Sequence, residues 1–204
     1  MPRASRVTDS FSHERAAVLR SALFAVLVAA IAAPPPPTAT TMTSVAPDTL
    51  GQFPHVDGTN LEGDDFALPA DFKGTLNVVF VAFKREQQAD VDSWTPFMKP
   101  VLESRRQLRA YELPVLGRRY RLVRSFIDGG MRRGIPDATV RAATITLYID
   151  KSPFRDALRL HDEERIYVLL VDQQGRVLWR TEGHFDERAG AELVRRIDEV
   201  SAAH

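Results

Sequence analysis

The sequence predicts an α/β domain in which a mixed sheet is flanked by helices on both faces. Residues 76–83 (LNVVFVAF) form a nearly continuous apolar run, which is typical of a strand buried on both faces. A helical pattern follows this run, and a β-hairpin pattern appears at 166–182. Because a strand that is apolar on both sides needs cover on both sides, we expect helices on both faces of the sheet.

The composition of the 204 residues fits one folded domain with an extension. Apolar residues make up 44%, and 27 basic side chains balance 27 acidic ones, so the net charge is zero. A neutral chain disfavours nucleic-acid binding driven by overall charge, and we expect no nucleic-acid partner. The chain has no cysteine, which excludes disulfides, thiolate metal sites and every thiol-based redox mechanism.

The amino-terminal 47 residues are expected to lie outside the domain. Residues 22–33 are an unbroken apolar run that would span about 18 Å as a helix, short of the roughly 30 Å of a bilayer core. The A-x-A spacing of Ala30 and Ala32 favours a signal peptide over 1–33, and therefore an exported, periplasmic or membrane-tethered protein. An uncleaved anchor, a transit peptide and a misread start are the alternatives. Pro/Thr-rich residues 34–47 are predicted to be a linker, which leaves 48–204 as the domain.

The first half of the domain alternates strands and helices. After the strand at 76–83, a helix carries an apolar row, and Pro96 and Pro100 inside the pattern predict a kink or a break. A short strand at 108–113 then ends at Pro114. The row consists of Val91, Trp94, Met98, Val101 and Leu102.

The second half begins with an amphipathic helix expected at 118–131, whose apolar row includes Tyr120, Val123 and Ile127. The apolar run TITLYI then predicts a third strand, and the turn QQG between two β-rich segments predicts a hairpin. The remaining elements are strands at 144–149, 166–172 and 176–182 and helices at 154–158 and 186–202.

The carboxyl-terminal pattern is an apolar strand ending in Asp172, a turn with Gly175, a second strand and Gly183 before the last helix. This pattern resembles the thioredoxin-like fold of peroxiredoxins and membrane-tethered thioredoxins. FPHVDGTNLEG at 53–63 resembles the entry hairpin of the redoxin branch, and residues 76–94 stand where the redox strand, the active-site loop and the first helix would be. The resemblance implies a thioredoxin-like mixed sheet that lacks the nucleophilic cysteine.

Four segments resemble a narrower family, the mitochondrial ATP synthase assembly factor and its bacterial relatives. These segments are AFKREQQADVDSW at 82–94, YELPVL at 111–116, FIDGGMRRGIPD at 126–137 and IYVLLVDQQGRVLWRTEG at 166–183. This resemblance implies assistance to a protein partner, such as a membrane complex, and not turnover of a substrate.

The polar loop after the central strand is the first candidate binding site. Loops at the carboxyl ends of sheet strands commonly bind ligands in α/β folds. This loop offers two cations, one acid and two amides, which can hold a carboxylate, a phosphate or a peptide backbone. The alternative is a plain helix start, in which the acid favours the helix dipole and the rest is solvated. Its residues are Lys84, Arg85, Glu86, Gln87 and Gln88.

Two further residues belong to the same candidate site. Glu112 ends the neighbouring strand, and we expect it to pair with Lys84 or Arg85; a proton-shuttle role is the alternative. Trp94 lies on the apolar row, so core packing competes with a role as a stacking platform for a partner.

Arginine is concentrated between residues 105 and 133. Nine arginines face two acids there, a local charge of +7 that suits an acidic partner or an anionic membrane surface. Arg118 and Arg119 are the residues chosen as binding candidates. The alternative is a set of solvated faces paired with Asp162, Glu163 and Glu164. The arginines are Arg105, Arg106, Arg109, Arg118, Arg119, Arg121, Arg124, Arg132 and Arg133.

No common catalytic or cofactor motif is present in the sequence. It has no phosphate loop, no G-x-G-x-x-G, no G-x-S-x-G and no His pair at metal-ligand spacing, so we expect neither a cofactor nor a metal. The favoured function is an exported, non-enzymatic binding or assembly-helper protein. One alternative is an enzyme that uses Lys84 or Glu86 as its acid–base group. Another is a protein that binds membrane surfaces through its arginines.

Overall fold

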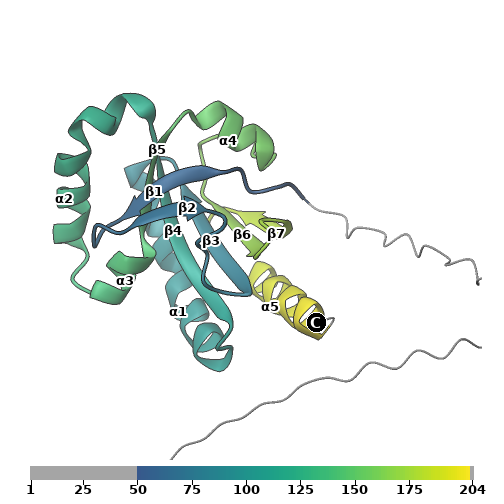
Figure 1. Cartoon of the computed structure of the whole chain (residues 1–204). Helices are drawn as coiled ribbons and strands as arrows, with labels where there is room; N and C mark the ends of the chain where they lie inside the picture. Colours follow the sequence, from purple (N-terminus) through teal and green to yellow (C-terminus); the bar gives the residue numbers. More distant parts are fainter. Residues whose placement is uncertain (1–49, 203–204) are drawn as a thin grey trace, which may run out of the picture. The chain divides into compact units, whose positions relative to one another are not determined.

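A seven-stranded mixed sheet forms the centre of the domain in the computed structural model, which describes residues 50–202 (Figure 1). The expected signal peptide or anchor at 1–33 and the linker at 34–47 lie outside the described residues. The strands are β1 (Val56–Asn60), β2 (Asp65–Leu68), β3 (Leu76–Ala82), β4 (Leu108–Gly117), β5 (Ile145–Ile149), β6 (Tyr167–Asp172) and β7 (Val177–Glu182).

Helices connect most of these strands. The short 3-10 helices are η1 (Arg85–Gln87) and η2 (Arg118–Val123). The α-helices are α1 (Gln88–Ser104), α2 (Arg124–Gly134), α3 (Ala138–Ala143), α4 (Lys151–Ala157) and α5 (Glu187–Ala202).

The strand order is β2-β1-β5-β4-β3-β6-β7. The predicted central strand β3 is buried along its whole length, because it pairs with β4 in parallel and with β6 in antiparallel orientation. The predicted hairpin β6–β7 joins the same sheet, and β1 and β2 form the expected entry hairpin.

Two apolar cores lie on opposite faces of the sheet. On one face, Trp94 of α1 and Leu193 of α5 pack against Val78 and Phe80. Figure 1 shows α1 and α5 next to each other. On the other face, α4 and the entry hairpin cover Val79 and its neighbours. The predicted class, a mixed sheet with helices on both faces, is confirmed.

Helix α1 runs unbroken through both of its prolines. Pro96 and Pro100 lie four residues apart on the solvent-facing side, where water can satisfy the carbonyls that lose a partner. The apolar row predicted for this helix is buried as expected, with Leu102 partly buried.

Two predicted boundaries were wrong. Strand β4 does not end at Pro114 but continues to Gly117, because its partner changes from β3 to β5 at that point. Proline has no N–H to donate, so it is tolerated where the ladder to β3 stops. The helix predicted at 118–131 is instead η2 followed by α2, neither of which buries a single residue.

Candidate functional site

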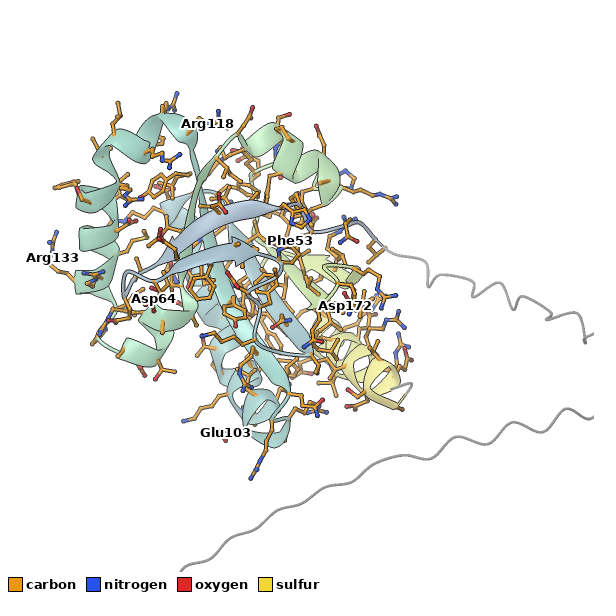
Figure 2. All side chains as sticks on the ribbon, viewed as in Figure 1. Phe53, Asp64, Glu103, Arg118, Arg133 and Asp172 are labelled. Atoms are coloured by element: carbon orange, nitrogen blue, oxygen red, sulfur yellow. The ribbon has the colours of Figure 1, made fainter. Side chains whose placement is uncertain are left out.

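The sheet topology brings two groups of predicted binding residues, the loop from Lys84 and the start of the arginine segment, to the carboxyl ends of neighbouring strands. Strands β3, β4 and β5 are parallel, so their carboxyl ends meet at the same edge. The loop from Lys84 follows β3, Arg118 follows β4, and α4 follows β5. Figure 2 shows Arg118 close to α4. The structure therefore brings the loop and the start of the arginine segment to one edge, although their sequence positions are more than thirty residues apart.

The loop after β3 is closed by Gln87, whose side chain is 4% exposed. Its Oε1 accepts hydrogen bonds from the backbone N–H groups of Phe83 (2.8 Å) and Lys84 (3.1 Å). Its Nε2 donates to the carbonyl of Glu163 at 2.8 Å, which ties the loop to the segment before β6. With both ends of the amide engaged, Gln87 holds the loop in place and is not accessible to a partner.

The other loop residues are exposed. Lys84 forms an ion pair with Glu164 at 2.6 Å, and both side chains are well exposed, so the pair contributes little to stability. Gln88 donates to Asp92 at 3.0 Å. Arg85 and Glu86 are exposed to solvent, so this part of the predicted contact surface stays accessible.

The predicted pairing of Glu112 with Lys84 or Arg85 was wrong. The Glu112 carboxyl lies under the start of α1, where Gln88 is its hydrogen-bond partner and Asp92 is the nearby charge. Burial raises the pKa of Glu112, and the Asp92 charge adds to this, while the Gln88 hydrogen bond opposes it. The strand neighbourhood was predicted correctly, but the side chain points toward α1 and not toward the loop cations.

Trp94 packs in the core and does not offer a surface to a partner. It is completely buried, its indole N–H donates to the carbonyl of Gly183 at 3.1 Å, and its ring packs edge-on against Phe185. The core alternative for Trp94 therefore holds, since a side chain without exposed area is out of reach of a binding partner.

The arginine-rich stretch divides into structural and exposed members. Arg105 pairs with Asp198 at 2.8 Å, and Arg109 donates to two backbone carbonyls. The alternative, in which these arginines pair with Asp162, Glu163 and Glu164, was wrong for the two glutamates, because they pair with cations from other parts of the chain. Those cations are Lys84, Lys151 and Arg155. Asp162 accepts a hydrogen bond from the backbone N–H of Glu164.

The 3-10 helix η2 follows β4 directly, and α2, which comes next, lies beside the sheet at the left of Figure 1. Leu122 is 95% exposed, Phe126 78% and Val123 49%. We call these three residues together with Arg119 the η2–α2 surface. An amphipathic pattern in sequence is the same whether its apolar face meets a core or a partner, which is why sequence reasoning did not find this surface.

Two polar contacts tether α2 to the domain. The hydroxyl of Tyr148 on β5 donates to Asp128 at 2.7 Å, and Arg132 donates to the carbonyl of Leu61. Burial, with the hydrogen bond and charge of Asp128, raises the pKa of Tyr148 and keeps its hydroxyl protonated as a donor. The segment is thus fixed in place while its apolar side chains face solvent.

A cleft of about 480 Å³ opens between the start of η2 and α4. Glu163 in its wall is neutralised by Lys151 and by Arg155, whose Nε lies 3.4 Å away. Arg118 and Arg119 also line the cleft, and Asp150 is its second acid. Four cations therefore face two acids, and this excess positive charge attracts an anionic group. Lys84 and Glu86 line neither this cleft nor the larger one between β1 and β5.

The fold follows from the order of four strands, β4-β3-β6-β7. In this group β3 and β4 are parallel, β6 and β7 are antiparallel, and α1 and α5 pack on one face. The domain has the thioredoxin-like fold. The position of its redox loop is occupied by Lys84–Gln88, and since the chain has no cysteine, it is not a thiol redox protein.

Solved structures with this architecture share little sequence with the chain. A candidate electron transport protein from Aquifex aeolicus VF5 is 9% identical with a TM-score of 0.55, over 72% of this chain and 95% of that one. BsSco, a member of the Sco family of cytochrome c oxidase assembly proteins, is 12% identical with a TM-score of 0.53, over 78% of this chain and 98% of that one. No family model and no curated protein matches the chain. These similarities show the fold alone.

Among residues 50–202, no cluster of three or more His, Asp or Glu side chains is placed to hold a metal ion. Within the same range, every helix is too short or too polar to cross a bilayer.

Proposed function

We propose that this protein is a non-enzymatic binding protein that assists the assembly of a protein complex, and that it contacts its partner through the η2–α2 surface. The absence of cysteine removes the thiol chemistry of redoxins, so the fold serves as a scaffold. The loop at the former redox position contributes at most the exposed side chains of Lys84, Arg85, Glu86 and Gln88.

One observation carries the proposal: the exposure of Leu122 and Phe126 on a segment that buries no residue. Covering one such side chain with a partner stabilises a complex by about 1.5–3 kcal/mol. Large apolar side chains that gather on a basic segment are typical of an interaction site, whereas isolated ones are common on any surface.

The charge of the segment indicates the chemistry of the partner. Between Arg118 and Gly134, six arginines face the single acid Asp128, so the segment carries 6 − 1 = +5. Arginine forms bidentate contacts with carboxylates, and complementary charge speeds and orients association. An acidic protein surface with an apolar centre is therefore the favoured partner.

The assembly role rests on two supports. Segments of the sequence resemble the mitochondrial ATP synthase assembly factor family and its bacterial relatives. BsSco, which has the same architecture, belongs to a family of cytochrome c oxidase assembly proteins. With the expected export or tethering of the chain, these supports favour a membrane complex as the partner.

Affinity capture from a membrane fraction tests the proposal. Wild type is compared with a Leu122→Ser/Phe126→Ser variant, and a Lys84→Ala/Arg85→Ala variant serves as the matched control on the loop. We expect the control to capture the same protein as wild type and the apolar variant to lose it. Equal capture by all three proteins would overturn the η2–α2 assignment, and selective loss in the loop variant would assign binding to Lys84 and Arg85.

An anionic membrane surface is the second candidate partner of the same segment. Exposed Leu and Phe side chains beside several arginines are the composition of segments that lie at a membrane interface. Vesicles with and without anionic lipid distinguish the two candidates, because membrane binding requires the anionic lipid and falls steeply with salt. Capture of one protein by detergent-solubilised material, without vesicle binding, would favour the protein partner.

A further inference from the structure

A cleft of about 830 Å³ lies where β1 and β5 diverge. The two strands pair only at Thr59–Thr146 and Asn60–Ile145. Beyond these pairs, Asp57 on β1 and Tyr148 on β5 no longer face each other across a ladder and line the cleft instead. The segment η2–α2 closes one side of it through arginine side chains. The cleft therefore exists because a strand pair stops early.

A buried hydroxyl at this cleft has no partner. Thr146 is 1% exposed and lines the cleft, yet its Oγ1 makes no hydrogen bond within residues 50–202. Its cross-strand neighbour Thr59 differs, because its hydroxyl donates to Asp65 at 2.9 Å. Buried polar groups are almost always paired, so this hydroxyl, in a residue that lines the cleft, is a group that a hydrogen bond formed on ligand binding could satisfy.

One wall of the cleft presents three guanidinium groups. Arg118, Arg121 and Arg124 follow one another at a spacing of three residues, which places side chains on the same face of a 3-10 helix. None of the three forms an ion pair with another described residue. They are therefore available to a carboxylate or phosphate, which guanidinium binds in bidentate fashion.

Carboxylates come from the other walls. Asp65, Asp71 and Asp150 accept hydrogen bonds from Thr59, Ala67 and Ser152, and their carboxyl oxygens have further lone pairs that can accept from another donor. Asp57 is exposed at the rim. The cations thus come from η2–α2. Asp57, Asp65 and Asp71 come from the β1–β2 side, and Asp150 follows β5. Apolar side chains also line the cleft, namely Val56, Phe66, Ile149, Pro153 and Phe154.

We infer that this cleft binds a small zwitterion with an apolar body, of the amino-acid or short-peptide class. The carboxylate of the ligand lies against Arg118, Arg121 and Arg124, and its ammonium group lies on the side of the aspartates. The Thr146 hydroxyl gains a hydrogen bond to the ligand backbone. A ligand with only one charge would match one wall and face like charge on the other. A cleft with positive and negative walls therefore favours a zwitterionic molecule.

The inference is independent of the η2–α2 surface, because it uses side chains that line the cleft and not the exposed Leu122 and Phe126. The probes are the dipeptide leucyl-leucine, its N-acetyl derivative and its carboxyl-terminal amide, titrated into the folded domain by NMR and calorimetry. We expect saturable binding of the free dipeptide with a Kd of about 1 mM or tighter. Each derivative loses one charge and should bind about tenfold more weakly.

Variants separate the parts of the site. Arg121→Gln should weaken dipeptide binding about tenfold, whereas the matched control Arg133→Gln should leave it unchanged, since Arg133 lies on the outer side of α2 (Figure 2). Thr146→Val removes the unpaired hydroxyl, so the unliganded domain should be at least as stable as wild type while binding weakens. No saturable binding, equal binding of all three probes, or equal effects of the Arg121 and Arg133 variants would each overturn the proposal.

Discussion

Replacing Gln87 with alanine should release the loop at Lys84–Gln88 from the hydrogen bonds that hold it and destabilise the domain. The side chain satisfies two backbone N–H groups, of Phe83 and Lys84, and donates to the carbonyl of Glu163. Alanine can make none of these bonds. Because Phe83 is buried, its N–H would be left without a partner, whereas water can reach the groups at Lys84 and Glu163 in part.

The expected loss follows from these three bonds. A buried donor left unpaired costs about 1–3 kcal/mol, and each of the two partly buried groups costs less because water replaces its partner. We expect the free energy of unfolding to fall by about 3 kcal/mol. For a domain of this size, where 1 kcal/mol corresponds to about 3 °C, the Tm should fall by about 9 °C.

Thermal and urea unfolding of Gln87→Ala and wild type measure this difference, and hydrogen exchange reports on the Phe83 amide. Glu86→Ala is the matched control, since Glu86 is exposed next to Gln87 and its replacement should change stability by less than about 0.5 kcal/mol. A loss for Gln87→Ala as small as that of the control, with the Phe83 amide still protected, would refute the reasoning that Gln87 closes the loop.

The remaining predictions concern Glu112, which is partly buried beneath α1, and Trp94 of α1. Burial raises the pKa of Glu112 in the folded state, so the folded protein favours the protonated carboxyl. This contribution to the free energy of unfolding is fully present below the pKa of the unfolded chain, near 4.5, and is lost as the pH rises through the raised pKa of the folded state. Glu112→Gln should therefore gain stability relative to wild type with rising pH, as urea unfolding at several pH values will show; a constant difference would mean that Glu112 has an ordinary pKa. Trp94→Phe removes the hydrogen bond to Gly183 and leaves a void, so it should lower the free energy of unfolding by about 2 kcal/mol. Unchanged stability in this variant would contradict the packing of Trp94.

Local patterns predicted the strands well and the outer segments poorly. The apolar run of β3 and the turn between β6 and β7 depend on neighbouring residues, so the sequence shows them directly. The row on η2–α2 looked equally regular, but regularity does not tell a helix on a sheet from one that faces solvent. Contacts with the sheet make that distinction, and they involve residues far away in the chain.

The candidate site, too, was predictable from the sequence only in part. That a polar loop follows the central strand is visible in the sequence, whereas the structure shows that Arg118 follows a strand parallel to it. That Gln87 reaches the carbonyl of Glu163, 76 residues later, is not visible in the sequence, because a glutamine in a polar loop resembles any solvated residue. The unpaired hydroxyl of Thr146 likewise depends on where β1 stops pairing with β5.

The amino-acid sequence by itself determined that this thioredoxin-like domain has no thiol chemistry, because no packing can supply an absent sulfur atom. It also determined the central strand, since a run of apolar side chains can avoid water only inside a sheet. Only the tertiary structure decided which side chains face solvent or clefts. Exposure is set by the elements that pack against a residue, and those elements come from distant parts of the chain.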